Sequence, residues 1–277
     1  MNNHCFDAEW LPALRIIIEV SSRLGQPIMV IGASARDILL RINQLSPIRA
    51  TRDLDLAIEI ASWDGFAAMH ESLIASGYFV ADDAAHRLTY STGLPVDLIP
   101  YGGVTDAQTN ISWPPDHEIS MSVLGVKDAF DASFEIPLGD EPDALRLNVV
   151  SPAGLVLLKI FAWEERKSVT RKDAEDIYHL VDCYISLGNR SALEQYHVDL
   201  FDEIETANAR LLARDLFEIC SDNTLSVLDA LLSRETEKAS MSQLLRDMLP
   251  RHADSDLQSR WQRKLLSMKK EINYLSA

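Results

Sequence analysis

The hydrophobic pattern of this chain changes at Ser151-Pro152, and this change constrains the fold more than any other feature. Up to residue 150, short apolar runs typical of buried strands alternate with segments of helical periodicity. From there on the spacing is almost entirely helical, and Pro152 suits the first turn of a helix that Ser151 would cap. We therefore predict an α+β domain over 1–150 and a helical domain over 151–277. The helices predicted in the second part lie at about 152–166, 171–187, 204–221, 224–233, 240–249 and 255–274.

The chain begins with a predicted helix, strand and second helix. Apolar residues fall at helical spacing over Asp7–Leu24, and Ile28–Ile31 is a short apolar run. The small residues Gly32-Ala33-Ser34 follow this run and precede helical spacing over Ala35–Ile42. Such a turn lets a phosphate group approach the free N–H groups at a helix start, although many turns contain glycine and serine for conformational reasons alone.

The clearest strand lies at residues 53–60, where acidic and apolar residues alternate with a period of two. Asp53 and Asp55 project from the same face of this strand and lie within reach of one Mg²⁺ ion. Two unpaired carboxylates so close would repel each other, and a divalent cation removes that penalty. The alternative is a solvated polar face of an edge strand.

A third acidic residue, Asp97, lies among the apolar residues of Val96–Pro100. Strands over His86–Thr92 and Pro95–Tyr101 would form a hairpin around Gly93-Leu94. A carboxylate among apolar residues needs a partner if it is buried, and the alternative is that it faces water. The remaining elements predicted here are a helix over 63–75, an irregular segment over 102–120 and strands over 132–138 and 144–150.

Together, the small-residue turn, Asp53-x-Asp55 and Asp97 predict a site for nucleotidyl transfer. Three carboxylates around two metal ions are the arrangement that this reaction requires. One ion would hold a nucleoside triphosphate, and the other would lower the pKa of the attacking hydroxyl. Asp97 would bind the second ion and accept the proton.

These motifs resemble those of the DNA polymerase β-like nucleotidyltransferase superfamily, and more closely those of the AbiEii/AbiGii-type toxin nucleotidyltransferases. The resemblance spans roughly residues 25–185 and rests on the segments Val30–Asp37, Arg49–Asp55 and Val96–Gly102. It implies a nucleotidyltransferase-type mixed sheet flanked by helices, followed by a C-terminal helical domain. The implied ligands of two Mg²⁺ ions are Asp53, Asp55 and Asp97, and the implied phosphate contacts are Gly32, Ala33 and Ser34. In this chain Ala33 separates Gly32 from Ser34, where the superfamily usually has Gly-Gly or Gly-Ser.

A triphosphate needs positive charge, and the second part supplies Lys159 and Lys172. Lys159 lies in an apolar helical run, with Arg166 on the same face seven residues later. Lys172 and Asp176 are four residues apart and would form an ordinary surface pair in the alternative interpretation. The toxin family has a similar pattern of Lys and Arg-x-Lys-Asp, which implies that Lys159 and Lys172 contact the triphosphate or the base.

Two further residues have two possible interpretations each. Arg36 pairs with Asp37 or lines the pocket, and Trp113 fills the core or stacks on a base.

The chain has 277 residues, with 26 basic against 42 acidic, so its formal charge is −16. This charge counts against broad DNA or RNA binding, which needs a dense basic surface. An RNA acceptor would have to contact a local basic patch at 166–172 or 260–270.

No apolar stretch approaches the roughly 20 residues of a membrane-spanning helix. No secretory signal pattern is visible, and Cys5, Cys183 and Cys220 show no disulfide or zinc spacing. We expect a cytoplasmic protein that does not bind membranes.

The resemblance implies transfer of a nucleoside monophosphate from a nucleoside triphosphate to an acceptor hydroxyl, with release of pyrophosphate. The implied acceptor is the 3′ end of tRNA or a protein hydroxyl, and the implied setting is a toxin–antitoxin or phage-defence pair with a cognate antitoxin. Two alternatives stay open. One is an antibiotic nucleotidyltransferase, because an acidic chain suits a cationic aminoglycoside. The other is a non-catalytic nucleotide sensor, although a binding module has no need for three clustered acids.

Overall fold

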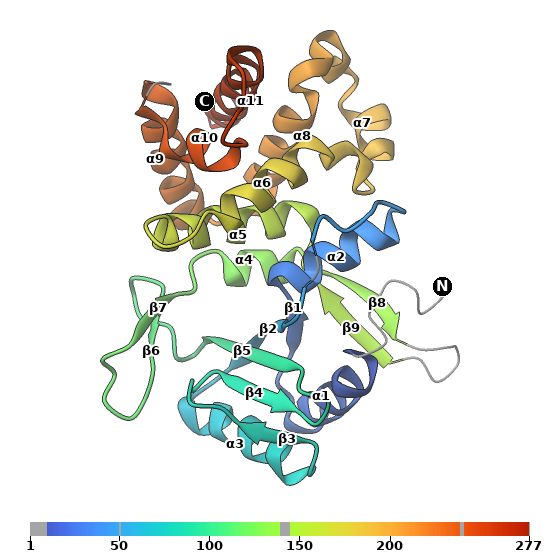
Figure 1. Ribbon diagram of the computed structural model, residues 1–277, viewed down its shortest axis with the longest axis vertical. Coiled ribbons are helices and arrows are strands. Elements are labelled where there is room, and N and C mark those ends of the chain that lie inside the picture. The colour runs from blue at the N-terminus through green and yellow to red at the C-terminus, as the bar shows by residue number, and fades with distance from the viewer. Residues whose placement is uncertain (1–9, 50, 139–144, 239–240, 277) are drawn as a thin grey trace. The chain divides into compact units, whose positions relative to one another are not determined.

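The computed structural model describes residues 10–49, 51–138, 145–238 and 241–276. The chain forms two compact units, Met1–Ser151 and Pro152–Ala277 (Figure 1). Parts of some sequence predictions lie outside the described residues. They are the first residues of the first helix with Cys5, Ala50 in the Arg49–Asp55 segment, Ala144 in the last predicted strand, and Ser240 at the start of the helix predicted over 240–249.

A seven-stranded mixed sheet forms the centre of the first unit (Figure 1). Its strand order is β3-β4-β5-β2-β1-β9-β8. β2 pairs in parallel with β5 and antiparallel with β1, and β1 pairs in parallel with β9. The predicted mixed sheet with flanking helices is therefore confirmed. The strands are β1 (Ile28–Val30), β2 (Leu54–Ile60), β3 (Phe79–Ala81), β4 (Arg87–Tyr90), β5 (Pro95–Gly102), β8 (Phe134–Leu138) and β9 (Leu145–Val149).

Burial along β2 explains why its acidic residues face away from the core. Leu54, Leu56 and Ile58 are each completely buried. Because side chains alternate along a strand, burial of these residues turns Asp53 and Asp55 to the opposite face of the sheet. The period-two pattern of the sequence thus decides which side of the sheet carries the acids.

Helices accompany the sheet in the first unit: α1 (Trp10–Leu24), α2 (Gly32–Ile42), α3 (Trp63–Ala75) and α4 (Val126–Asp131). α1 buries one face against α3 and β9, with Leu14 and Ile17 completely buried. The N-cap of α3 is Ser62, whose hydroxyl accepts a hydrogen bond from the Gly65 N–H. α2 starts at Gly32, earlier than predicted, so the small residues expected as a separate turn form its first turn.

A second, small sheet begins in the segment that was predicted to be irregular and extends two residues past its end. β6 (Asn110–Ser112) and β7 (Ser120–Ser122) pair antiparallel there. The ring of Trp113 lies 5.3 Å from that of Trp63 and 5.5 Å from that of Phe66, and the side chain is buried, which agrees with the core interpretation. These strands, together with β3 and α4, are too short to leave a periodic signal in the sequence.

The described residues of the second unit form helices (Figure 1). α5 packs on α6, and α8 packs on α11. The helix predicted over 171–187 ends at Asp182 and is followed by a short 3₁₀ turn, Tyr184–Ser186; α7 and a second 3₁₀ segment, Val198–Glu203, were not predicted. No helix in the described ranges combines the length and apolar character needed to cross a membrane. The α-helices are α5 (Pro152–Arg166), α6 (Lys172–Asp182), α7 (Arg190–Tyr196), α8 (Ile204–Ile219), α9 (Asp222–Glu237), α10 (Gln243–Met248) and α11 (Ser255–Leu275).

Candidate functional site

Two neighbouring strands of the first unit bring three aspartates together. β2 and β5 run parallel, with Asp55 directly opposite Asp97, and Asp53 lies two residues before Asp55 on the same face. One carboxylate oxygen of each residue lies within 4.8 Å of the others. Asp97 is buried, and the other two are half-buried. We call these three residues the carboxylate cluster.

The chemistry of this cluster fits a hard divalent cation. Carboxylate oxygens are the ligands that Mg²⁺ prefers, and it is usually held by one or two carboxylates together with substrate phosphates. Three negative charges at this spacing repel one another, and partial burial strengthens the repulsion because water screens it less. A cation placed among them removes this cost, so the cluster suits binding rather than stability.

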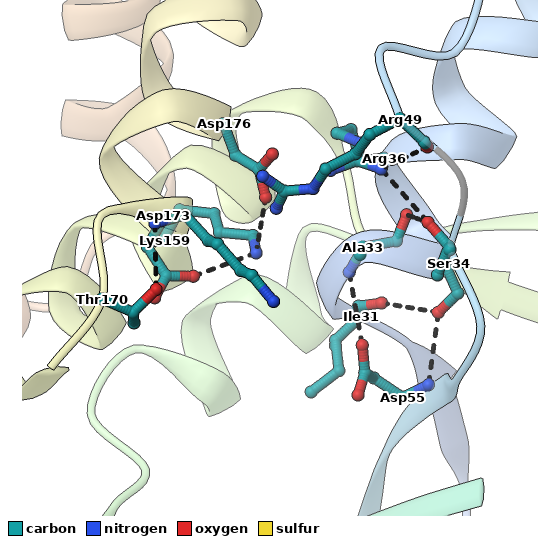
Figure 2. Close-up of polar contacts among 12 residues, drawn as sticks. Ile31, Ala33, Ser34, Arg36, Arg49, Asp55, Lys159, Thr170, Asp173 and Asp176 are labelled. Atoms are coloured by element: carbon teal, nitrogen blue, oxygen red, sulfur yellow. Dashed lines mark hydrogen bonds and ion pairs between the residues drawn. The ribbon is translucent and has the colours of Figure 1, made fainter. Parts of the chain in front are cut away.

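The first turn of α2 positions Asp55 (Figure 2). The Ala33 N–H donates a hydrogen bond to Asp55 Oδ2 at 3.3 Å. Gly32 has a φ of +64°, and a Cβ atom there would lie 2.1 Å from Asp55 Oδ2. Only glycine therefore combines this backbone conformation with such a close approach of the carboxylate.

Ser34 anchors the backbone of the same strand. Its hydroxyl donates to the Ile31 carbonyl at 2.9 Å and accepts from the Asp55 N–H at 3.3 Å (Figure 2). The residue is completely buried, whereas Gly32 and Ala33 are half-buried. The Ser34 hydroxyl, which was predicted to approach a phosphate, is thus engaged within the protein, and the phosphate contacts of the turn stay a prediction.

A buried ion pair supports the turn from within the unit. Arg36 Nη2 lies 2.7 Å from Asp37 Oδ1, and Thr51 Oγ1 donates to Asp37 Oδ2 at 2.7 Å. Arg36 also donates to the Arg49 carbonyl at 3.3 Å. These bonds connect α2 to the segment that leads into β2. Of the two interpretations of Arg36, pairing with Asp37 is the one that the structure contains.

Arg87 of β4 belongs to the site and was missed by sequence reasoning. It lies directly opposite Asp97 across the antiparallel ladder of β4 and β5. Its Nε donates to Asp97 Oδ1 at 2.6 Å, and its Nη2 donates to Asp97 Oδ2 at 2.7 Å. The hydrogen bond to Asp97 raises the pKa of Arg87 against the opposing effect of burial, and the charges of Asp97, Asp53 and Asp82 raise it further.

The signal that could have found Arg87 is the register of the hairpin. A two-residue turn at Gly93-Leu94 places Tyr90 opposite Asp97. The observed connection is longer, with the Tyr90 N–H bonded to the Leu94 carbonyl, and Arg87 takes that position instead. A search for a basic residue within three positions of the expected partner would have identified it.

The two lysines predicted to contact a nucleotide lie in the second unit, in different surroundings. Lys159 is buried, with its ammonium 3.1 Å from Asp173 Oδ1 and 2.9 Å from Asp176 Oδ2 (Figure 2). Lys172 is exposed, and its ammonium forms no ion pair within the described part of the chain. The alternative interpretation, a surface pair of Lys172 with Asp176, is not what the structure contains, because Asp176 pairs with Lys159. Arg166 Nη2 binds Asp173 Oδ2 at 2.8 Å and completes a group that we call the α5–α6 ion cluster: Lys159, Arg166, Asp173 and Asp176.

Two solved structures resemble the fold of this chain at low similarity. One is an antigenic nucleotidyltransferase-like protein from Paracoccidioides brasiliensis, with 15% identity, a TM-score of 0.40 and coverage of 71% of this chain and 93% of that chain. The other is ANT(2″)-Ia in complex with adenylyl-2″-tobramycin, with 14% identity, a TM-score of 0.39 and coverage of 66% and 92%. No curated protein matches the sequence.

A family model, described as the nucleotidyl transferase AbiEii toxin of type IV toxin–antitoxin systems, matches residues 38–270. The match extends beyond residue 185, where the resemblance was expected to end, and covers most of the helical unit. It begins after the Gly32-Ala33-Ser34 turn and includes all three residues of the carboxylate cluster. Because the match covers most of the sequence, this chain belongs to the AbiEii family of toxin nucleotidyltransferases.

Proposed function

We propose that this protein transfers a nucleoside monophosphate from a nucleoside triphosphate to an acceptor hydroxyl at the carboxylate cluster. The observation that carries the proposal is the convergence of Asp53, Asp55 and Asp97 within 4.8 Å. Membership of a nucleotidyltransferase family supports it. The acceptor oxygen forms a bond to the α-phosphorus, the bond from that phosphorus to the bridging oxygen breaks, and pyrophosphate leaves.

The cofactor of this proposal is Mg²⁺, as two ions. Asp53, Asp55 and Asp97 would hold them, and this assignment rests on the oxygen donor set and the clustering of the acids. When bound, Mg²⁺ neutralises phosphate charge and lowers the pKa of the attacking hydroxyl. Asp97 would take up the proton of that hydroxyl.

Phosphate groups would meet the start of α2 through the backbone of Gly32 and Ala33. Ser34 would act indirectly, because its buried hydroxyl holds Ile31 and Asp55 in place. Nucleotide contacts by Lys159 and Lys172 stay predictions. Exposure favours Lys172, whereas the ammonium of Lys159 already lies between two carboxylates.

The acceptor would be the 3′ end of a tRNA or a protein hydroxyl, and the setting would be a cytoplasmic toxin with a cognate antitoxin. Both basic segments considered for RNA contact are rich in ion pairs with acidic neighbours. In the first, Arg166 pairs with Asp173. In α11, Arg263 pairs with Glu205, and Lys264 pairs with Asp182. This pairing, together with the charge of −16, counts against an extended RNA-binding surface.

Transfer is tested with nucleoside triphosphates labelled at the α-phosphate, Mg²⁺ and either total tRNA or a protein extract. Label is expected in one of these acceptors, and Asp53→Asn abolishes it. Glu59→Gln is the matched control, because Glu59 lies on β2, which Asp53 directly precedes, and is also half-buried, but lies outside the cluster. Label on an aminoglycoside instead would identify an antibiotic-modifying enzyme. Tight triphosphate binding without transfer to any acceptor would identify a sensor.

A further inference from the structure

The ion pair between Arg87 and Asp97 uses a carboxylate that the proposed function needs for a divalent cation. Both oxygens of Asp97 accept hydrogen bonds from the guanidinium, at 2.6 Å from Nε and 2.7 Å from Nη2. A bidentate guanidinium–carboxylate pair is among the stronger polar contacts in proteins. A cation that binds Asp97 must therefore share or displace this contact.

The backbone holds Arg87 at this position. Arg87, Asp97 and Asp55 lie side by side on the adjacent strands β4, β5 and β2, each in register with the next. The Leu98 N–H donates to the His86 carbonyl at 2.8 Å, which fixes the ladder beside the pair. The guanidinium thus lies at the cluster because of the strand register rather than through a chance surface contact.

The surroundings also allow the guanidinium to leave Asp97. The Arg87 side chain is 33% exposed, whereas that of Asp97 is 12% exposed. The Asp82 N–H donates to the Arg87 carbonyl at 3.3 Å, and Asp82 is exposed. The charge of Asp82 also acts on the Arg87 guanidinium. A released guanidinium therefore has a second carboxylate nearby.

We propose that Arg87 is a resident counter-cation: it neutralises Asp97 while no divalent cation is bound, and it gives up at least one Asp97 oxygen when a cation binds. This inference rests on the proposed function, because the competing cation is the one assigned to the carboxylate cluster. Two positive groups on one carboxylate repel each other, so the Arg87 contact lowers the affinity of the site for a cation. The same contact stabilises the cation-free protein.

The test uses the full chain, without nucleotide, and Mn²⁺ as the probe, with bound Mn²⁺ measured by electron paramagnetic resonance. R87Q is expected to bind Mn²⁺ about tenfold more tightly than the wild type, which is the size expected for the loss of one competing charged hydrogen-bond contact. R87K keeps the positive charge but lacks the paired N–H donors of the guanidinium. Its Mn²⁺ affinity is expected to lie between those of R87Q and the wild type. R52Q is the matched control and should bind like the wild type, because it removes the same charge from an exposed residue next to Asp53.

Thermal unfolding gives a second readout that does not depend on activity. Without metal, R87Q is expected to unfold at a lower temperature than the wild type, and Mn²⁺ should raise its unfolding temperature by a larger increment. If R87Q does not fold, the same two measurements on R87K test the proposal, and R87K is expected to bind Mn²⁺ more tightly than the wild type.

The two possible failures are distinguishable. Equal or weaker Mn²⁺ binding by R87Q, with clear binding by the wild type, would overturn the role of Arg87 and leave the metal site intact. If neither protein binds Mn²⁺, the assignment of the metal site is wrong, and so is the role of Arg87 as a counter-cation.

Discussion

Each unit of this protein contains a group of charged side chains at least partly removed from water, and the two groups differ in charge balance. The carboxylate cluster contains three acids, and the guanidinium of Arg87 binds one of them, Asp97. The α5–α6 ion cluster, as defined above, contains two acids and two basic residues that pair with them, and both acids and Lys159 are buried. The same residue types therefore occur in an unbalanced, half-exposed group and in a balanced, mostly buried one.

Under the proposed function, this difference separates a group that binds a metal ion from a group that holds two helices together. A balanced buried cluster satisfies its own charges, and removal of one partner leaves an uncompensated charge. A cluster with an excess of acids keeps some repulsion between them, and a bound cation relieves it. We therefore expect substitutions in the first unit to affect catalysis and metal binding, and substitutions in the second to affect stability.

The largest expected effect is on transfer by the carboxylate cluster. Asp53→Asn should lower the rate of nucleotidyl transfer by about a thousandfold or more, since it removes a proposed metal ligand. Its free energy of unfolding without metal should not fall, because one repelling charge is lost. Rates are measured with labelled triphosphate and stability by urea titration. A stable but fully active variant would place the chemistry elsewhere.

A large loss of stability is expected in the α5–α6 ion cluster. Lys159→Met leaves Asp173 and Asp176 with less positive charge, and should lower the free energy of unfolding by about 3 kcal/mol. Lys172→Met, at an exposed lysine, should change it by about 0.5 kcal/mol or less. Urea unfolding of both variants measures the contrast. Equal stability of the two variants would contradict a structural role for Lys159.

Addition or removal of metal should change the stability of the protein through the carboxylate cluster and not through the α5–α6 ion cluster. Mg²⁺ at tens of times its dissociation constant should stabilise the wild type by about 2 kcal/mol, and a chelator should reverse this gain. Lys159→Met should keep the Mg²⁺-dependent increment, whereas Asp53→Asn should lose it. Calorimetric unfolding with and without Mg²⁺ provides the comparison. An increment that survives in Asp53→Asn would show that the cation binds at another place.

The smallest expected effect is a pH dependence of stability that comes from His70, a residue of the first unit outside the carboxylate cluster. Burial lowers the pKa of His70, although a backbone hydrogen bond to Arg87 and the charge of Glu71 oppose it. As the pH falls below 6.5, the unfolded chain takes up a proton at this histidine that the folded chain resists, so stability falls. His70→Gln should remove this component. Unfolding free energies between pH 5 and pH 8 test it, and an unchanged slope would assign the dependence to other groups.

The sequence predicts this molecule best where a pattern is repeated over several residues. The alternation at residues 53–60 identifies β2 and the face that carries Asp53 and Asp55, because one face of the strand must be buried. The long amphipathic helices α5 and α11 were predicted within one or two residues of their ends for the same reason. Three-residue strands such as β3 contain too few positions for any period to be visible.

What the sequence could not predict are the partners of its charges. Arg87 was missed because the length of the hairpin connection shifts the register, and no local pattern reports that length. Helical spacing suggested Lys172 as the partner of Asp176 in one of the two interpretations, but the packing of α5 on α6 places Lys159 beside it. Both errors arise because tertiary packing, rather than spacing along one element, decides which charges meet.

The most direct test of the central claim is a crystal structure of the protein soaked with Mn²⁺ and a non-hydrolysable nucleoside triphosphate, with anomalous diffraction used to locate the metal. We expect anomalous density within about 2.1 Å of carboxylate oxygens of Asp53 and Asp55. Density beside Lys159 or elsewhere, or none at the carboxylate cluster, would contradict the assignment of this cluster as the metal site for nucleotidyl transfer.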